Sequence, residues 1–120
     1  MSALGLLERG EFSAARELLA AIVRDPAEPL ADDALLLVAR SHADEGDADL
    51  AVAAYERVAS DFPDSLLAPQ ALLTAARLCE AKLGDLDRAR RALQSLVETY
   101  PDSAAADEAA ERLQSVARDQ

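Results

Sequence analysis

The sequence predicts an all-α fold, a right-handed superhelical solenoid of helix-turn-helix repeats with about three units and a C-terminal capping helix. The phrase FPDS at Phe62–Ser65 returns as YPDS at Tyr100–Ser103, 38 residues later. The apolar residues are mainly Ala and Leu, which form helices well, and β-branched residues are scarce. A period in the high thirties with two helical stripes in each period is typical of stacked helical hairpins.

An amphipathic helix follows each of three glycines, Gly10, Gly46 and Gly84. Apolar residues come after each glycine with the spacing i, i+3, i+4, i+7, which places them on one face of a helix. We expect each glycine to be the left-handed C-cap of the preceding helix. The three stripes are Ala15, Leu18, Leu19 and Ile22, then Ala51, Ala54, Tyr55 and Val58, then Ala89, Ala92, Leu93 and Leu96.

Another helix precedes each of the last two glycines. ALLLVARSH at Ala34–His42 aligns with ALLTAARLC at Ala71–Cys79, and the second copy has one extra residue before its glycine. Small side chains at matching positions predict close approach of the paired helices. The two stripes are Leu35, Val38, Ala39 and His42, and Leu72, Ala75, Ala76 and Cys79; the small residues are Ala39, Ala51, Ala76 and Ala89.

The Pro-Asp-Ser phrase separates the units. Proline cannot continue a helix, and Asp or Ser after it can accept hydrogen bonds from the first N–H groups of the next one. Pro69 suits the first turn of a helix. We expect one domain, residues 1–120, whose first unit ends near Pro26. The units are about 1–26, 27–63 and 64–101, with a capping helix at 102–118; the helices are 2–9, 12–24, 31–44, 48–61, 66–82, 86–99 and 104–118.

Composition excludes several classes of function. The chain has 23 acidic and 12 basic residues, a net charge of −11, which argues against binding nucleic acid or an anionic membrane. The longest apolar run, Ala34–Ala39, is too short for membrane insertion. We expect no signal peptide, because no basic segment followed by an apolar core opens the sequence. Cys79 is the only cysteine, so there is no internal disulfide.

The order of these residues resembles the tetratricopeptide repeat (TPR) family. That family has a small residue in the first helix, a glycine at the turn, an alanine early in the second helix, a large apolar residue four positions later and a final proline. The matching residues are Ala39, Gly46, Ala51, Tyr55 and Pro63; Ala76, Gly84, Ala89, Leu93 and Pro101; and, in part, Gly10, Ala15, Leu19 and Pro26.

The run from Gly46 to Leu113 is also similar to the C-terminal repeat domain in the family of Tol-Pal system cell-division coordinators. The YPDS phrase joins repeats in that family too. This resemblance implies a periplasmic module that binds protein partners in bacterial cell-envelope organisation or division. Without it, a cytoplasmic location is the expectation.

His42 and Cys79 are the only residues of their types, and a histidine and a cysteine can form a catalytic pair. The alignment puts them at equivalent positions in successive first helices, about 10 Å apart, which is too far for a nucleophile and its base. We expect both to pack at the helix seam. No second His or Cys exists to complete a zinc site, and the glycines are isolated. The sequence therefore predicts no enzyme, no cofactor and no metal.

First helices line the concave side of such a solenoid, and the residue one step past each stripe should face its groove. A leucine row beside an arginine row could hold a protein or peptide segment by apolar contact and a charge-assisted hydrogen bond. In an alternative reading, the arginines pair with neighbouring acids. The groove residues are Leu36 and Leu73, Arg40 and Arg77, Asp33 and Gln70 before them, and Asp44 and Glu80 after them.

The leading hypothesis is a non-enzymatic protein-binding scaffold, a monomer or weak homo-oligomer. The alternative is a structural spacer or oligomerisation segment of a larger protein. Leu4 and Leu7 should be uncovered at the N-terminal edge, where Leu6 holds a short helix. In the last helix, Leu113 and Ala110 should repeat the inner stripe while polar residues face outward.

Overall fold

The computed structural model describes residues 2–25 and 27–118, and each regular element in these ranges is a helix. The predicted all-α repeat solenoid is confirmed, while the handedness of its superhelix stays a prediction. The elements are α1 (Ala3–Glu8), α2 (Phe12–Val23), α3 (Ala31–Asp44), α4 (Ala48–Asp61), α5 (Ala68–Leu78), the π-helix η1 (Cys79–Leu83), α6 (Leu86–Thr99) and α7 (Ala104–Arg118).

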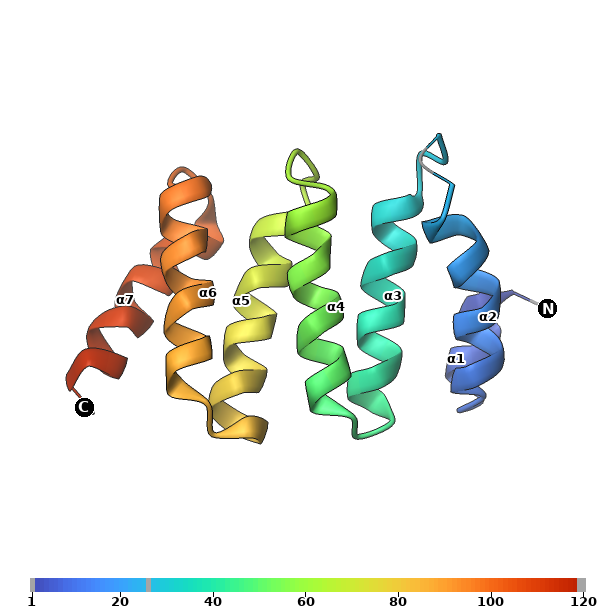
Figure 1. Cartoon of the computed structure of the whole chain (residues 1–120), viewed down its shortest axis with the longest axis horizontal. Coiled ribbons are helices and arrows are strands. Elements are labelled where there is room, and N and C mark those ends of the chain that lie inside the picture. The colour runs from blue at the N-terminus through green and yellow to red at the C-terminus, as the bar shows by residue number, and fades with distance from the viewer. Residues whose placement is uncertain (1, 26, 119–120) are drawn as a thin grey trace.

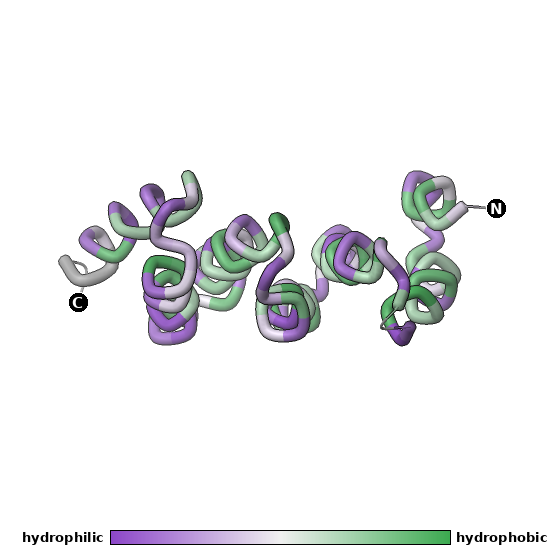
Figure 2. The backbone as a smooth tube through the Cα atoms, turned by 90° about the horizontal axis from the view of Figure 1, so that it is seen from above, coloured by the Kyte–Doolittle hydropathy of each residue, from purple (hydrophilic) through white to green (hydrophobic). Residues whose placement is uncertain are grey.

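The helices form two layers. The odd layer consists of α1, α3, α5 and α7, and the even layer consists of α2, α4 and α6 (Figures 1 and 2). Each helix packs mainly against its neighbours along the chain, so the molecule is an elongated slab of 47 × 29 × 18 Å. A slab of this kind presents the whole surface of both layers to partners.

Each hairpin turn depends on a glycine. Gly10, Gly46 and Gly84 have φ angles of 75°, 90° and 63°, in the left-handed region that glycine enters without strain. After the second and third turns, Asp47 and Asp85 accept a hydrogen bond from the backbone N–H three residues on, at 3.4 and 3.0 Å. The recurring Gly-Asp pair therefore ends one helix and starts the next.

The Pro-Asp-Ser phrases start the following helices as predicted. The Ser65 hydroxyl accepts from the N–H two residues on at 3.0 Å, and the Ser103 hydroxyl accepts from the N–H three residues on at 3.1 Å. Pro69 lies in the first turn of α5, where its missing N–H leaves no bond unmade. Pro26, the predicted end of the first unit, lies outside the described residues.

The extra residue in the second copy forms a π-helical turn. The predicted helix at 66–82 is α5 followed by η1, whose C-cap is Gly84. The Asp85 N–H donates to the carbonyl of Cys79 at 2.9 Å, and the equivalent bond after α3 joins the Asp47 N–H to the carbonyl of His42 at 2.8 Å. The π turn places one more residue between the two groups that form this bond. The apolar stripes on both sides of the turn therefore keep their register.

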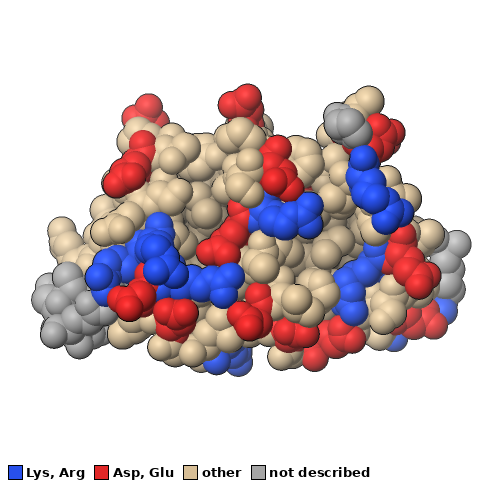
Figure 3. Space-filling view, in the orientation of Figure 1, with Lys and Arg blue, Asp and Glu red and all other residues tan. Residues whose placement is uncertain are grey.

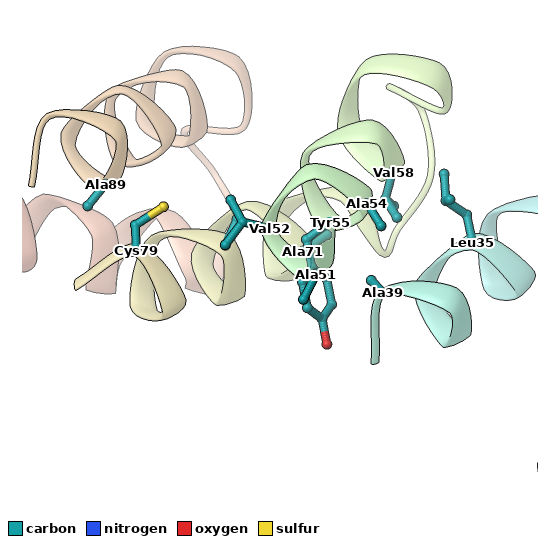
Figure 4. Packing of buried hydrophobic residues seen from close by; sticks show 11 residues of the cluster. Leu35, Ala39, Ala51, Val52, Ala54, Tyr55, Val58, Ala71, Cys79 and Ala89 are labelled. Atoms are coloured by element: carbon teal, nitrogen blue, oxygen red, sulfur yellow. The ribbon is translucent and has the colours of Figure 1, made fainter. Parts of the chain in front are cut away.

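Two apolar clusters fill the interior. The first joins α3, α4 and α5 around Tyr55 and Val58 (Figure 4). The second joins α5, α6 and α7 around Leu93 and Leu96. Side chains no larger than a methyl group allow the backbones to approach closely where helices pair. The alanines predicted at these contacts have no exposed surface: Ala39, Ala51, Ala76 and Ala89.

Two residues predicted in the apolar stripes are exposed instead. Leu18 is 45% exposed, and Ala110 is exposed on α7. Both belong to outer helices, which have a neighbouring unit on one side only among the described residues. Ala109 is buried in place of Ala110, and Leu113 packs against the second cluster as predicted.

Candidate functional site

The odd layer carries all the residues predicted to face a groove. Asp33, Leu36, Arg40 and Asp44 lie on α3, while Gln70, Leu73, Arg77 and Glu80 lie on α5 and η1. The charged and polar members are exposed, except for the half-buried Glu80. The two leucines are less exposed than predicted, and the two arginines differ in whether they form an ion pair.

The leucine row is not an exposed row. Leu73 is only 2% exposed and packs in the second cluster with residues of α6 and α7. Leu36 is half-buried against the first cluster. The prediction that Leu73 offers apolar surface to a partner is wrong, because the next unit covers that side of α5. An interior helix of a solenoid packs against units on both sides, so its buried face is wider than one stripe.

Arg77, the member of the arginine row near α7, forms an ion pair within the chain. Arg77 donates from Nη2 to both carboxylate oxygens of Glu108, at 2.8 and 2.6 Å. Arg112 of α7 donates in the opposite direction, to Glu80. For Arg77, the alternative reading of pairing with a neighbouring acid is therefore confirmed. A partner could reach this guanidinium only by competing with α7.

Arg40 forms no ion pair in the described part of the chain. The repeat explains this difference from Arg77. Gln70 precedes Glu108 by 38 residues, and so holds the equivalent position in the previous unit. Arg40 therefore has the neutral side chain of Gln70 at the position where Arg77 has the carboxylate of Glu108. The N–H groups of the exposed Arg40 guanidinium remain able to donate charge-assisted hydrogen bonds.

A hollow of about 330 Å³ opens beside Arg40 in the odd layer. Its walls are Leu4, Leu7 and Glu8 of α1 together with Arg40 and Asp44 of α3. Leu4 is 55% exposed, as predicted, whereas Leu7 is half-buried. The hollow therefore combines apolar surface with a guanidinium and two carboxylates, which suits an apolar side chain and the charged group beside it.

Tyr55 lies near two charged residues of this hollow, Arg40 and Asp44. Its side chain extends from α4 past Ala39 of α3 (Figure 4) and is 6% exposed. Burial raises the pKa of Tyr55, Arg40 lowers it and Asp44 raises it further. The phenol is therefore neutral at physiological pH and lies within electrostatic range of both charged residues.

The surroundings of His42 and Cys79 do not support a catalytic pair. Cys79 is fully buried, and burial raises its thiol pKa, with nearby charges on Arg88 and Glu56. Burial lowers the pKa of His42, whose charged neighbours are Arg16, Asp47 and Glu45. The two side chains thus face different sets of charges. No cluster of His, Cys, Asp and Glu suited to a metal ion occurs among the described residues.

A two-layer stack of helical hairpins with an open charged face defines a helical-repeat protein. One family model, described as tetratricopeptide repeat, matches residues 1–65, and a second with the same description matches residues 42–113. The chain therefore belongs to the tetratricopeptide repeat family, whose repeats generally mediate protein–protein interactions in non-enzymatic scaffolds. No curated protein matches the chain.

The family matches are general ones, and the narrower resemblance to the Tol-Pal coordinators stays a prediction. In the described residues, no helix combines the length and apolar character needed to cross a membrane.

Proposed function

We propose that this chain is a non-enzymatic scaffold that binds a segment of a partner protein in the odd layer, at the hollow between α1 and α3. The observation that carries the proposal is the contrast between Arg40 and Arg77. Arg77 is already paired with Glu108, while Arg40 is exposed and unpaired among the described residues.

The chemistry of the hollow defines the segment. A carboxylate of the partner would form a charge-assisted hydrogen bond with Arg40, and an apolar side chain beside it would cover Leu4. Asp44 and Glu8 would favour a basic or neutral residue further along the segment. The Tol-Pal resemblance supports a setting in bacterial envelope organisation or division, in the periplasm.

The exposed Leu4 also favours a second candidate, an oligomerisation segment. A second copy that covered Leu4 would remove the same apolar surface from water. Sedimentation of the wild type and of Leu4→Ser separates the two. A concentration-dependent dimer that Leu4→Ser abolishes supports oligomerisation, and a monomer at all concentrations supports the binding of a partner.

Peptide selection tests the scaffold directly. Peptides would be selected on the immobilised chain from a displayed random library, and their Kd measured for wild type, Arg40→Ala and the matched control Arg77→Ala. We expect Arg40→Ala to raise Kd about tenfold, equivalent to about 1.4 kcal/mol, and Arg77→Ala to leave it unchanged. Selected peptides whose affinity does not depend on Arg40 would refute the assignment.

A further inference from the structure

The even layer, on the opposite side of the molecule from the Arg40 hollow, has two grooves that the repeat makes equivalent. The first, about 240 Å³, lies between α2 and α4, and the second, about 300 Å³, lies between α4 and α6. Val23 and Leu35 line the first groove. Their equivalents in the next unit, Ala59 and Leu72, line the second. Leu35 and Leu72 are buried, so the accessible apolar surface of the first groove comes from the half-buried Val23 and Val38.

The charged rim distinguishes the first groove from the second. Arg16, Arg24 and Arg57 rim the first groove, and Figure 3 shows basic side chains spread across this face of the molecule. The charged residues that line the second groove, Glu56 and Arg91, have opposite signs. The repeat-equivalent positions of the three arginines hold Val52, Ser60 and Ser95. The hairpin stack therefore forms without arginine at these places.

The rim arginines retain hydrogen-bond donors that could bind a partner. Arg57 directs its Nε and Nη2 to a single oxygen of Asp61, at 3.1 and 3.0 Å, which leaves the other N–H groups of the guanidinium open. Arg24 is exposed and has no ion pair among the described residues. Arg16 is more enclosed, because it donates to Ser41 and Glu45 at 3.1 and 2.9 Å.

The net charge of the chain does not oppose an acidic ligand on this face. Within their bounds the even helices carry five arginines and six acids, and the charged residues that flank them are Arg24 after α2 and the N-caps Glu11, Asp47 and Asp85. The excess negative charge therefore lies in the odd layer and in the connections. The charged residues that line the α2–α4 groove itself are all arginines, so this rim attracts an acidic segment at short range.

We propose that the α2–α4 groove binds a second protein segment, one that carries an apolar side chain flanked by carboxylates. A hollow of about 240 Å³ is smaller than the roughly 300–1,000 Å³ of small-molecule sites, and it suits a single side chain over the half-buried Val23 and Val38. The flanking carboxylates bind the open donors of Arg24 and Arg57. This surface is independent of the Arg40 hollow.

The test uses three labelled peptides in the same glycine-serine host, with the cores Glu-Leu-Glu, Lys-Leu-Lys and Glu-Ser-Glu. They are titrated into ¹⁵N-labelled protein. The test variant combines Arg24→Ser with Arg57→Ser, the residue that the next unit has at both equivalent positions. Arg91→Ser in the second groove and Arg40→Ala in the odd layer are the matched controls, and circular dichroism verifies the fold of each variant.

We expect the Glu-Leu-Glu peptide to shift amides in residues 16–24, 35–38 and 57. The double variant should raise its Kd about tenfold, because it removes two exposed charge pairs. Neither control should change it, and the other two peptides should bind more weakly. Equal binding of Lys-Leu-Lys, shifts centred on the second groove, an unaffected double variant, or no saturable shift at millimolar peptide would each overturn the proposal.

Discussion

Replacing Gly46 by alanine tests the role of the glycines in the hairpin turns. Gly46 has φ of 90°, and an added Cβ would meet nothing within 4 Å, so the cost comes from backbone conformation alone. Holding an L-residue in the left-handed region costs about 1–2 kcal/mol. For a domain of this size, that loss lowers Tm by about 3–8 °C. Thermal unfolding followed by circular dichroism at 222 nm measures the change.

Two further variants act as controls for this prediction. Gly46→Asn should be less destabilising than Gly46→Ala, because Asn enters the left-handed region more readily. Gly5 lies inside α1 without a positive φ, and an added Cβ would lie 3.3 Å from the Ser2 hydroxyl oxygen. Gly5→Ala should therefore gain helix propensity against a small shift of Ser2, and should not show the loss expected at position 46. An alanine at position 46 that leaves Tm unchanged, or that equals asparagine, would refute the reasoning.

Three other predictions concern the Tyr100 hydroxyl, His42 and α1. The Tyr100 hydroxyl donates to the carbonyl of Pro63 in the previous unit at 2.7 Å, so Tyr100→Phe should lower the free energy of unfolding by about 0.5–1.5 kcal/mol in urea titrations; an unchanged midpoint would show that this link between units adds nothing. Burial and then Arg16 lower the pKa of His42, whose Nδ1 is buried without a hydrogen-bond partner. The His42 imidazole therefore binds a proton more readily in the unfolded state than in the folded state. The contribution of His42 to the free energy of unfolding is fully present above pH 6.5 and declines as the pH falls below that value. His42→Gln should flatten this decline, and identical urea midpoints against pH for both proteins would contradict it. Finally, α1 has 6 residues and is marginal alone, so amides in residues 3–8 should exchange faster than those in 86–99, and equal protection in a monomer would count against this view.

The helices were predictable because the signals that start and end them are local. These signals act through φ angles and through hydrogen bonds within three residues, as at Gly84, Asp85 and Ser103. The neighbouring residues in the sequence are therefore enough to recognise them. The extra residue before Gly84 was visible in the alignment. Its accommodation as a π turn was not, because that outcome depends on the packing of Cys79 in the interior.

The binding face was less predictable, because exposure depends on neighbours far away in the sequence. Leu73 fits a groove position by periodicity, yet α6 and α7 cover it. Arg40 and Arg77 are matched by the repeat, and Glu108 alone makes them different. The proximity of Leu4 to Arg40 arises from the packing of α1 beside α3, which no single stripe reveals.

Mapping a library-selected peptide onto ¹⁵N-labelled protein tests the central claim most directly. A scaffold that binds through the Arg40 hollow should show its largest chemical-shift changes in residues 4–8 and 36–44, the segments that bring Leu4, Leu7 and Arg40 together. In Arg40→Ala these changes should need about tenfold more peptide to saturate, whereas in Arg77→Ala they should saturate as in the wild type. Changes confined to α5, α6 and α7, or a selection that yields no binding peptide, would contradict the account.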